Sequence, residues 1–215
     1  MDWDEKRRRL MEATLGHVPF DGWTDASLRR AAEDVGLTVA DVLDAFPGGA
    51  VETLELFLAE ADRRMIADLE SADLASLKVR EKVLLAVRRR LERVLPHREA
   101  VRRGLATLAL PQNAPLALRS LYRTVDAVWF GIGDTSTDWN FYSKRAILAG
   151  VYGATVLYWL DDRSEGQAKT WDFLARRLDD AIKVPRAIGQ GFDRLRRLAT
   201  DFPNPLRRFD RAFRG

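Results

Sequence analysis

Apolar residues recur along this chain at spacings of three and four, and no convincing run alternates apolar and polar positions as a strand would. This spacing places apolar side chains on one face of a helix, so the pattern predicts an all-α bundle. Proline and glycine separate the periodic segments, as expected where helices end. The pattern predicts about nine to ten helices, at residues 3–16, 25–35, 39–46, 50–70, 76–95, 97–109, 115–131, 138–161, 166–184 and 187–201.

One uncharged run of fifteen residues, 146–160, contains several bulky aromatic side chains. A membrane span needs about 18 to 20 apolar residues, so this run is too short to cross a bilayer without a strong tilt. Ala146, Gly150 and Ala154 recur at every fourth position, where small side chains let another helix approach closely. The run therefore predicts a helix in a bundle core and at a dimer interface. Its mixture of aromatic and small residues also favours an apolar cavity.

Residues 24–46 predict a helix, a tight turn and a short second helix that Thr38 caps. The surrounding stretch, GWTDASLRRAAEDVGLTVADVLDAFPGG, resembles the DNA-binding half of TetR-type repressors, whose nine-helix fold holds a ligand cavity in its larger C-terminal part. From residue 21 to residue 62, ten acidic and two basic residues give a net charge of −8. Asp41 and Asp44 lie where a major-groove reader needs cationic or amide side chains. We therefore expect a structural helix-turn-helix and no DNA binding.

Composition excludes several kinds of chemistry. The 215 residues include no cysteine and two histidines, which excludes disulfides, thiolate metal sites and thiol catalysis. Neither His17 nor His97 has a glutamate three residues before it, as a carboxylate-bridged di-iron bundle requires. The adjacent Asp161 and Asp162 are typical of a solvated helix end. We expect a protein that is not an enzyme and that binds no metal or cofactor.

A longer resemblance is carried by four segments: LALPQNAP (108–115), VDAVW (125–129), GDTSTDWNFYSKRAILAGVY (133–152) and KTWDFLARRLDDA (169–181). From about Leu10 to Lys183 the chain resembles the lipid-binding accessory protein of coenzyme Q biosynthesis, the ninth member of that pathway's set. The resemblance implies a TetR-like fold, a homodimer and an isoprenoid quinone or phospholipid in the interior. It also implies support of the di-iron hydroxylase that acts on demethoxyubiquinone, so that the partner carries the metal.

Two groups of residues are the expected contacts of this bundle. The expected lipid contacts lie on the two central helices and are Trp129, Leu148, Val151, Tyr152, Thr155, Tyr158 and Trp159. The expected hydroxylase contacts lie at the start of the long helix and are Asp138, Asn140, Phe141 and Tyr142. Three neighbouring aromatic residues cannot all face one core at helical spacing, so at least one is free to anchor a partner.

The C-terminal tail predicts a basic amphipathic helix. From residue 186 to residue 214, eight arginines and three acidic residues give a net charge of +5. Such a helix suits an anionic membrane interface, although its apolar face could instead dock on the protein's own bundle. The expected membrane contacts are Ile188, Phe192, Leu195, Arg196, Arg197, Leu198 and Phe202.

The sequence as a whole predicts a helix-turn-helix-like part at 1–48, a lipid-binding and dimerisation part at 49–185 and a membrane-associating tail at 186–215. The predicted function is to bind isoprenoid quinone intermediates and membrane lipid and to present substrate to the hydroxylase. The alternatives are a TetR-type ligand-responsive transcription regulator and an all-α dimer without a small ligand. The first residues, MDWDEKRRRL, lack a secretory or transit signal, which predicts a bacterial protein, cytoplasmic and peripheral on the inner face of the cytoplasmic membrane.

Overall fold

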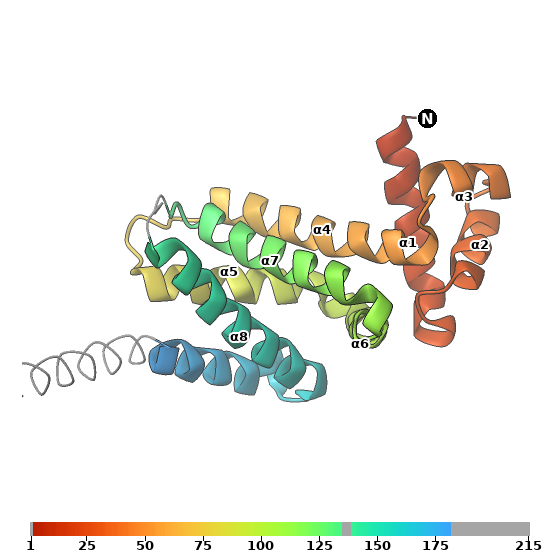
Figure 1. The fold of residues 1–215 in the computed structure, drawn as a ribbon. Coiled ribbons are helices and arrows are strands. Elements are labelled where there is room, and N and C mark those ends of the chain that lie inside the picture. Colours follow the sequence, from red (N-terminus) through yellow and green to blue (C-terminus); the bar gives the residue numbers. More distant parts are fainter. Residues whose placement is uncertain (1, 135–138, 182–215) are drawn as a thin grey trace, which may run out of the picture. The chain divides into compact units, whose positions relative to one another are not determined.

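The computed structural model describes residues 2–134 and 139–181, without the side chains of residues 139–142. Every regular element in these residues is a helix, so the predicted all-α fold is confirmed (Figure 1). The described α-helices are α1 (Trp3–Asp21), α2 (Asp25–Asp34), α3 (Val39–Ala45), α4 (Gly49–Glu70), α5 (Val79–Val94), α6 (Arg98–Leu108), α7 (Ala114–Gly131), α8 (Trp139–Asp161) and a further helix at residues 168–181.

The chain divides into two units, Met1–Ala175 and Arg176–Gly215. The first unit contains α1 to α8 and the start of the helix at 168–181. Of the second unit the structure describes residues 176–181, which are helical. The predicted helix at 187–201 and all seven expected membrane contacts lie outside the described residues. The predicted division of the chain into three parts stays a prediction.

The helix-turn-helix consists of α2 and α3, both of which contact α1. Thr38 begins α3 as predicted: its Oγ1 accepts a hydrogen bond from the Asp41 backbone N–H at 3.2 Å. The Asp41 carboxylate accepts one in return from the Thr38 N–H at 3.0 Å, which completes a capping box. Gly36, in the turn before it, has a φ of 70°, a conformation that favours glycine. Asp41 also pairs with Lys6 of α1 at 2.6 Å, so this acid fixes α3 in place.

Helix α4 contacts α5 and α7, and α8 contacts α7. Leu148, Tyr152 and Trp159 of α8 are buried, whereas Leu157 is 63% exposed. The small residues Ala146, Gly150 and Ala154 are also exposed, so α8 buries one face within the chain and leaves the small residues on its surface. Among the described residues, none of the helices has the length and apolar character of a membrane span.

The end of α8 differs from the expectation of a solvated terminus. The Asp161 side chain is 80% exposed, but Asp162 is buried. The Asp162 carboxylate accepts hydrogen bonds from the backbone N–H and the hydroxyl of both Ser164 and Thr170, at 2.6 to 2.8 Å. Burial alone would raise the pKa of Asp162, but these four donors hold it well below its usual value. The prediction is therefore wrong for Asp162, because the chain turns back here and the carboxylate fastens the turn.

Candidate functional site

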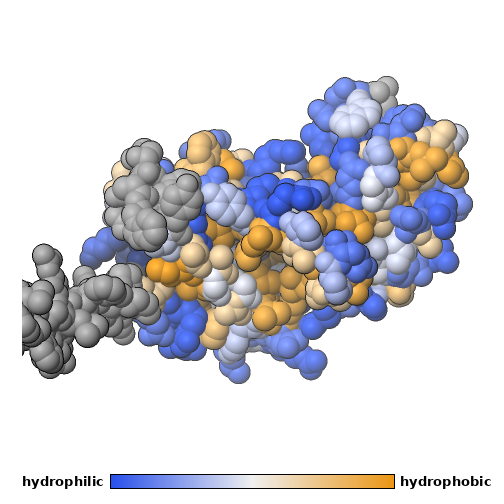
Figure 2. Space-filling view, viewed as in Figure 1, coloured by the Kyte–Doolittle hydropathy of each residue, from blue (hydrophilic) through white to orange (hydrophobic). Residues whose placement is uncertain are grey.

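A cavity of about 350 Å³ lies among α4, α5, α6, α7 and α8. Most of its wall consists of leucine, valine and alanine side chains, and four lining residues carry polar side chains: Arg90, Ser120, Thr124 and Tyr152. Figure 2 shows apolar residues gathered on the face of the molecule where α7 and α8 lie. At about 30 Å³ per water-sized group, the cavity has room for roughly a dozen heavy atoms. This size and lining suit part of an apolar ligand.

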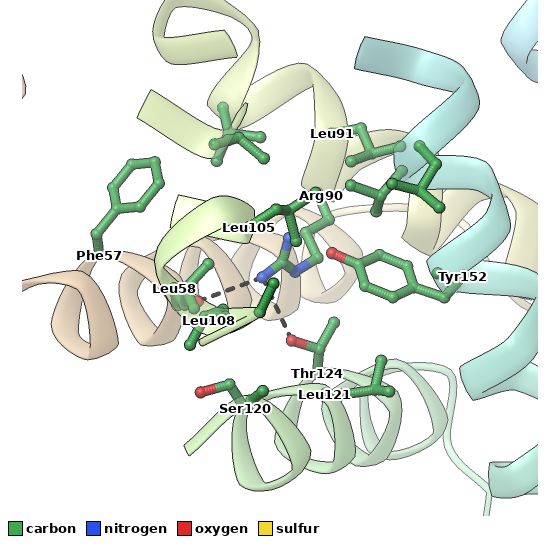
Figure 3. A pocket seen from close by; sticks show the side chains of 17 residues that line it. Phe57, Leu58, Arg90, Leu91, Leu105, Leu108, Ser120, Leu121, Thr124 and Tyr152 are labelled. Carbon is green, nitrogen blue, oxygen red and sulfur yellow. Dashed lines mark hydrogen bonds between the residues drawn. The ribbon is translucent and has the colours of Figure 1, made fainter. Parts of the chain in front are cut away.

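The polar side of the cavity is built on Arg90. Figure 3 shows its guanidinium reaching from α5 toward Leu58 of α4 and Thr124 of α7. Its Nε donates to Asp62 Oδ1 at 2.7 Å, and its Nη2 donates to Thr124 Oγ1 at 3.3 Å. Thr124 Oγ1 in turn donates to Asp62 Oδ1 at 2.9 Å. A buried charge is tolerated only when it is paired and hydrogen-bonded, and this network meets that condition.

Two further contacts complete the surroundings of Arg90. The Arg123 Nε donates to Asp62 Oδ2 at 3.2 Å, and the Arg123 guanidinium also pairs with Glu55 at 3.5 Å. Arg90 Cζ lies 5.3 Å from the centroid of the Tyr152 ring, whose hydroxyl is directed toward the guanidinium (Figure 3). Burial raises the pKa of Tyr152, so its hydroxyl stays protonated at neutral pH. Burial opposes the charge of Arg90, but Tyr152 and Asp62 keep its pKa above the ordinary value.

Ser120 differs from the other polar lining residues. It is 4% exposed, and its Oγ has no hydrogen-bond partner among the described residues. Thr124 follows Ser120 by four residues on α7, so both side chains lie on the same face of that helix, one turn apart. The cavity therefore has an apolar wall with one polar side, in which one hydroxyl is left without a partner.

Sequence reasoning missed most of this polar side. Arg90 stands in the run RRRLERV, where charge gives no reason to select one arginine. The available signal is spacing: Val83, Val87, Arg90 and Val94 fall on one buried face of α5. Of the expected lipid contacts, Tyr152 lines the cavity and the other six do not. As lipid contacts all seven stay predictions.

The other six expected lipid contacts lie elsewhere on α7 and α8. Trp129, Leu148, Thr155 and Trp159 are buried, and Val151 is half-buried. Tyr158 is more exposed and stacks on Phe173, with ring centroids 4.6 Å apart. Of the expected hydroxylase contacts, Asp138 and the side chains of Asn140, Phe141 and Tyr142 lie outside the described residues.

The ends of the motif at residues 133–145 fasten α8 to α7. Gly133 has a φ of 79°, and the Asp134 N–H donates to the Trp129 carbonyl oxygen at 3.0 Å. The buried Arg145 guanidinium pairs with Asp126 of α7 at 2.7 Å. These residues therefore have structural roles in the described part of the motif. In the described residues no cluster of three or more histidine, aspartate or glutamate side chains is arranged to hold a metal ion.

The fold is similar to a solved structure, the TetR transcriptional regulator from Nitrosomonas europaea ATCC 19718. The two are 20% identical and superpose with a TM-score of 0.69 over 83% of this chain and 99% of that chain. At this identity the similarity shows the fold alone. The predicted TetR-like architecture is confirmed.

Curated proteins similar to this chain share one name. The chain is 34% identical to the ubiquinone biosynthesis protein COQ9, mitochondrial, of Drosophila melanogaster, over 87% of this chain and 58% of that protein. It is 35% identical to the protein of the same name from Rattus norvegicus and 34% identical to that from Homo sapiens, over 87% of this chain and 62% and 61% of those proteins. The chain spans about three fifths of the length of these relatives.

The names of these relatives correct the predicted location. They are mitochondrial proteins by name, which contradicts a bacterial protein at the inner face of the cytoplasmic membrane. The prediction was wrong because it depended on the first ten residues alone. A COQ9 family model matches residues 114–185, which include all of α7 and α8. By this match and by its similarity to these relatives over 87% of its length, the chain is similar to COQ9 proteins.

Proposed function

We propose that this protein acts in ubiquinone biosynthesis by binding an isoprenoid quinone intermediate, without catalysing a reaction itself. The observation that carries the proposal is the apolar cavity of about 350 Å³ among α4 to α8 of a chain similar to COQ9 proteins. No histidine and no carboxylate is among its lining residues, so the cavity lacks the usual general bases. The chemistry then belongs to a partner, the di-iron hydroxylase that acts on demethoxyubiquinone.

The energetics agree with a role in handling lipid. Burying one isoprene unit contributes roughly 2 kcal/mol relative to water, by area bookkeeping. A cavity for about a dozen heavy atoms holds one or two such units, which gives only a few kcal/mol. Since a bilayer offers the same lipid a comparable apolar environment, the protein exchanges lipid with the membrane reversibly. Exchange of this kind suits presentation of a substrate to an enzyme.

The lipid proposal is tested by mass spectrometry of lipids extracted from protein purified without detergent. Gly153 lines the cavity, and a Cβ at this position would meet no atom within 4 Å, so Gly153→Leu places a side chain in the cavity. The matched control is Gly16→Leu on α1, an exposed helical glycine where a Cβ also meets nothing. We expect isoprenoid lipid with the wild type and the control, and at least tenfold less with Gly153→Leu. Equal amounts in all three proteins, or no lipid in any, would contradict the proposal.

We also propose that residues 138–142 supply the hydroxylase contacts and that the tail after residue 185 supplies membrane contacts. The first proposal rests on the family resemblance at Asp138, Asn140, Phe141 and Tyr142. The second rests on the net charge of +5 between residues 186 and 214, which favours an anionic lipid surface.

A further inference from the structure

The Ser120 hydroxyl is a polar lining group of the cavity that is buried and has no hydrogen-bond partner among the described residues. In water this hydroxyl would donate and accept hydrogen bonds, and burial removes them. Alanine would pack at this position in the wall without that loss. A hydroxyl with no structural task in an otherwise apolar cavity therefore indicates that a polar atom of the ligand comes within its reach.

Arg90 adds donors on the same side of the cavity. A guanidinium has five N–H donors, and the bonds to Asp62, Leu58 and Thr124 use its Nε and Nη2. Nη1 makes none of these bonds. The guanidinium cannot lose its proton here, so it donates and never accepts. The Tyr152 hydroxyl, which is protonated, can donate as well. This side of the cavity therefore suits a ligand with acceptor oxygens.

The charged side chains around the polar side of the cavity add up to no net charge. Asp62 and Glu55 carry two negative charges, and Arg90 and Arg123 carry two positive charges in direct contact with them. A phosphate or carboxylate head group would add an uncompensated negative charge at a buried position beside Asp62, which is costly. A neutral group with carbonyl or ether oxygens adds acceptors without adding charge.

The volume of the cavity limits which part of such a ligand it can enclose. With room for roughly a dozen heavy atoms, the cavity accepts a substituted ring but not the isoprenoid chain attached to it. Leu157 of α8 is 63% exposed and Ala109, beside α6, is also exposed, although both line the cavity. They mark the side on which the cavity meets solvent. The chain attached to an enclosed ring leaves there.

We propose that the cavity takes a prenylated quinone head-first: ring oxygens accept hydrogen bonds from the Ser120 hydroxyl and the Arg90 guanidinium, and the isoprenoid chain leaves past Leu157. This inference rests on the proposed function and adds the class of head group, a neutral one with acceptor oxygens, and its orientation. The ring is enclosed while the protein carries it, and only the chain stays outside.

The test is the change in affinity on Ser120→Ala. The probes are a dimethoxy-methyl benzoquinone with one prenyl group, a branched hydrocarbon of similar size and dodecyl phosphate, each titrated by calorimetry. Losing one hydrogen bond to the ring weakens quinone binding about fivefold to tenfold. The affinity for the hydrocarbon stays within twofold, and dodecyl phosphate binds more weakly than the quinone. Because Ser120 Oγ has no partner in the described fold, the melting temperature stays within a few degrees.

The outcomes separate this inference from the proposed function. Unchanged quinone affinity in Ser120→Ala, or dodecyl phosphate binding as tightly as the quinone, overturns the head-first orientation. A melting temperature lowered by more than about 8 °C also overturns it, because the hydroxyl then serves the fold. Gly153→Leu, which fills the cavity, abolishes binding of quinone and hydrocarbon alike. If neither apolar probe binds the wild type, the proposed lipid binding fails as well.

Discussion

The helices of the helix-turn-helix and those around the cavity use charged residues in different ways. Around α1 to α3, ion pairs such as Lys6–Asp41 and Arg30–Asp21 lie at the surface and hold neighbouring helices together. Around the cavity, the pair Arg90–Asp62 is buried beside apolar space, and Ser120 close by has no partner in the described fold. In the first region, ion pairs within the fold account for the acidic residues Asp21 and Asp41. In the second, the described fold gives the Ser120 hydroxyl no hydrogen-bond partner.

The largest expected difference between the two regions is in how far the free energy of unfolding falls when an arginine is replaced. Arg90→Leu leaves the buried Asp62 with a weaker partner, so the free energy of unfolding falls by about 3–5 kcal/mol. Arg30→Leu, at an exposed pair, costs no more than about 1 kcal/mol. Urea denaturation of both variants measures this. Similar losses in the two would show that burial does not distinguish the regions.

The second comparison is between two helix-terminal side chains, Asp162 near the cavity helices and Thr38 in the helix-turn-helix. Asp162→Asn disturbs four hydrogen bonds to a buried carboxylate and costs about 2–3 kcal/mol at pH 7. Thr38→Ala removes one exposed cap and costs about 1 kcal/mol.

The effect of Asp162 also depends on pH. Its pKa is lower in the folded chain than the ordinary value of 3.8, so its contribution is complete above about pH 5. The contribution is lost as the pH falls from there through the folded pKa. Unfolding curves at pH 7 and pH 3 therefore show a smaller difference between wild type and Asp162→Asn at pH 3. A difference that is equal or larger at pH 3 would be inconsistent with a depressed pKa.

A third comparison concerns the partner. We expect Phe141→Ala with Tyr142→Ala to reduce co-purification of the hydroxylase at least tenfold while the fold and the bound lipid persist. The matched double variant Val39→Ala with Leu43→Ala removes two exposed apolar residues of α3 instead, and should leave co-purification unchanged. Loss of the hydroxylase in the α3 variant alone would place the partner surface on the helix-turn-helix.

The smallest expected effect is on membrane binding, and it comes from the difference in charge between the acidic and basic parts of the sequence. Net charge is −8 from residue 21 to residue 62 and +5 from residue 186 to residue 214. A chain that ends at Val184 should bind anionic vesicles several-fold more weakly than the full chain in a flotation assay, and high salt should remove most of the difference. Binding that is unaffected by truncation or by salt would show that the tail is not an electrostatic anchor.

The helices were predicted well from the sequence because neighbouring residues determine where each helix begins and ends. Apolar spacing and the proline at 115 predict a helix at 115–131, and α7 spans Ala114–Gly131. Thr38 is recognisable as a cap because Asp41 follows it by three residues. The cavity depends on contacts between five helices, which periodicity along one helix does not specify. Trp159, an expected lipid contact, does not line the cavity and packs against Arg98, whose Cζ lies 4.8 Å from its ring; as a lipid contact it stays a prediction.

The polar side of the cavity could not be predicted from the sequence for a related reason. Spacing places Arg90 on the buried face of α5, but its partner Asp62 lies 28 residues earlier in the sequence, on α4. Nothing in the spacing of either helix specifies that the two meet. Ser120 is one of seven serines in the sequence, and its significance appears only once its hydroxyl is found buried and unpaired.

The volume of the cavity depends on the residue at position 153, which is glycine. Gly153 lines the cavity, and a Cβ at this position would touch nothing within 4 Å. Alanine, valine and leucine would therefore shorten the space in graded steps without moving α8, and each also suits a helix better than glycine. The residue at this one position thus sets the volume of the cavity with little effect on stability. Single substitutions there can change that volume while the bundle stays intact.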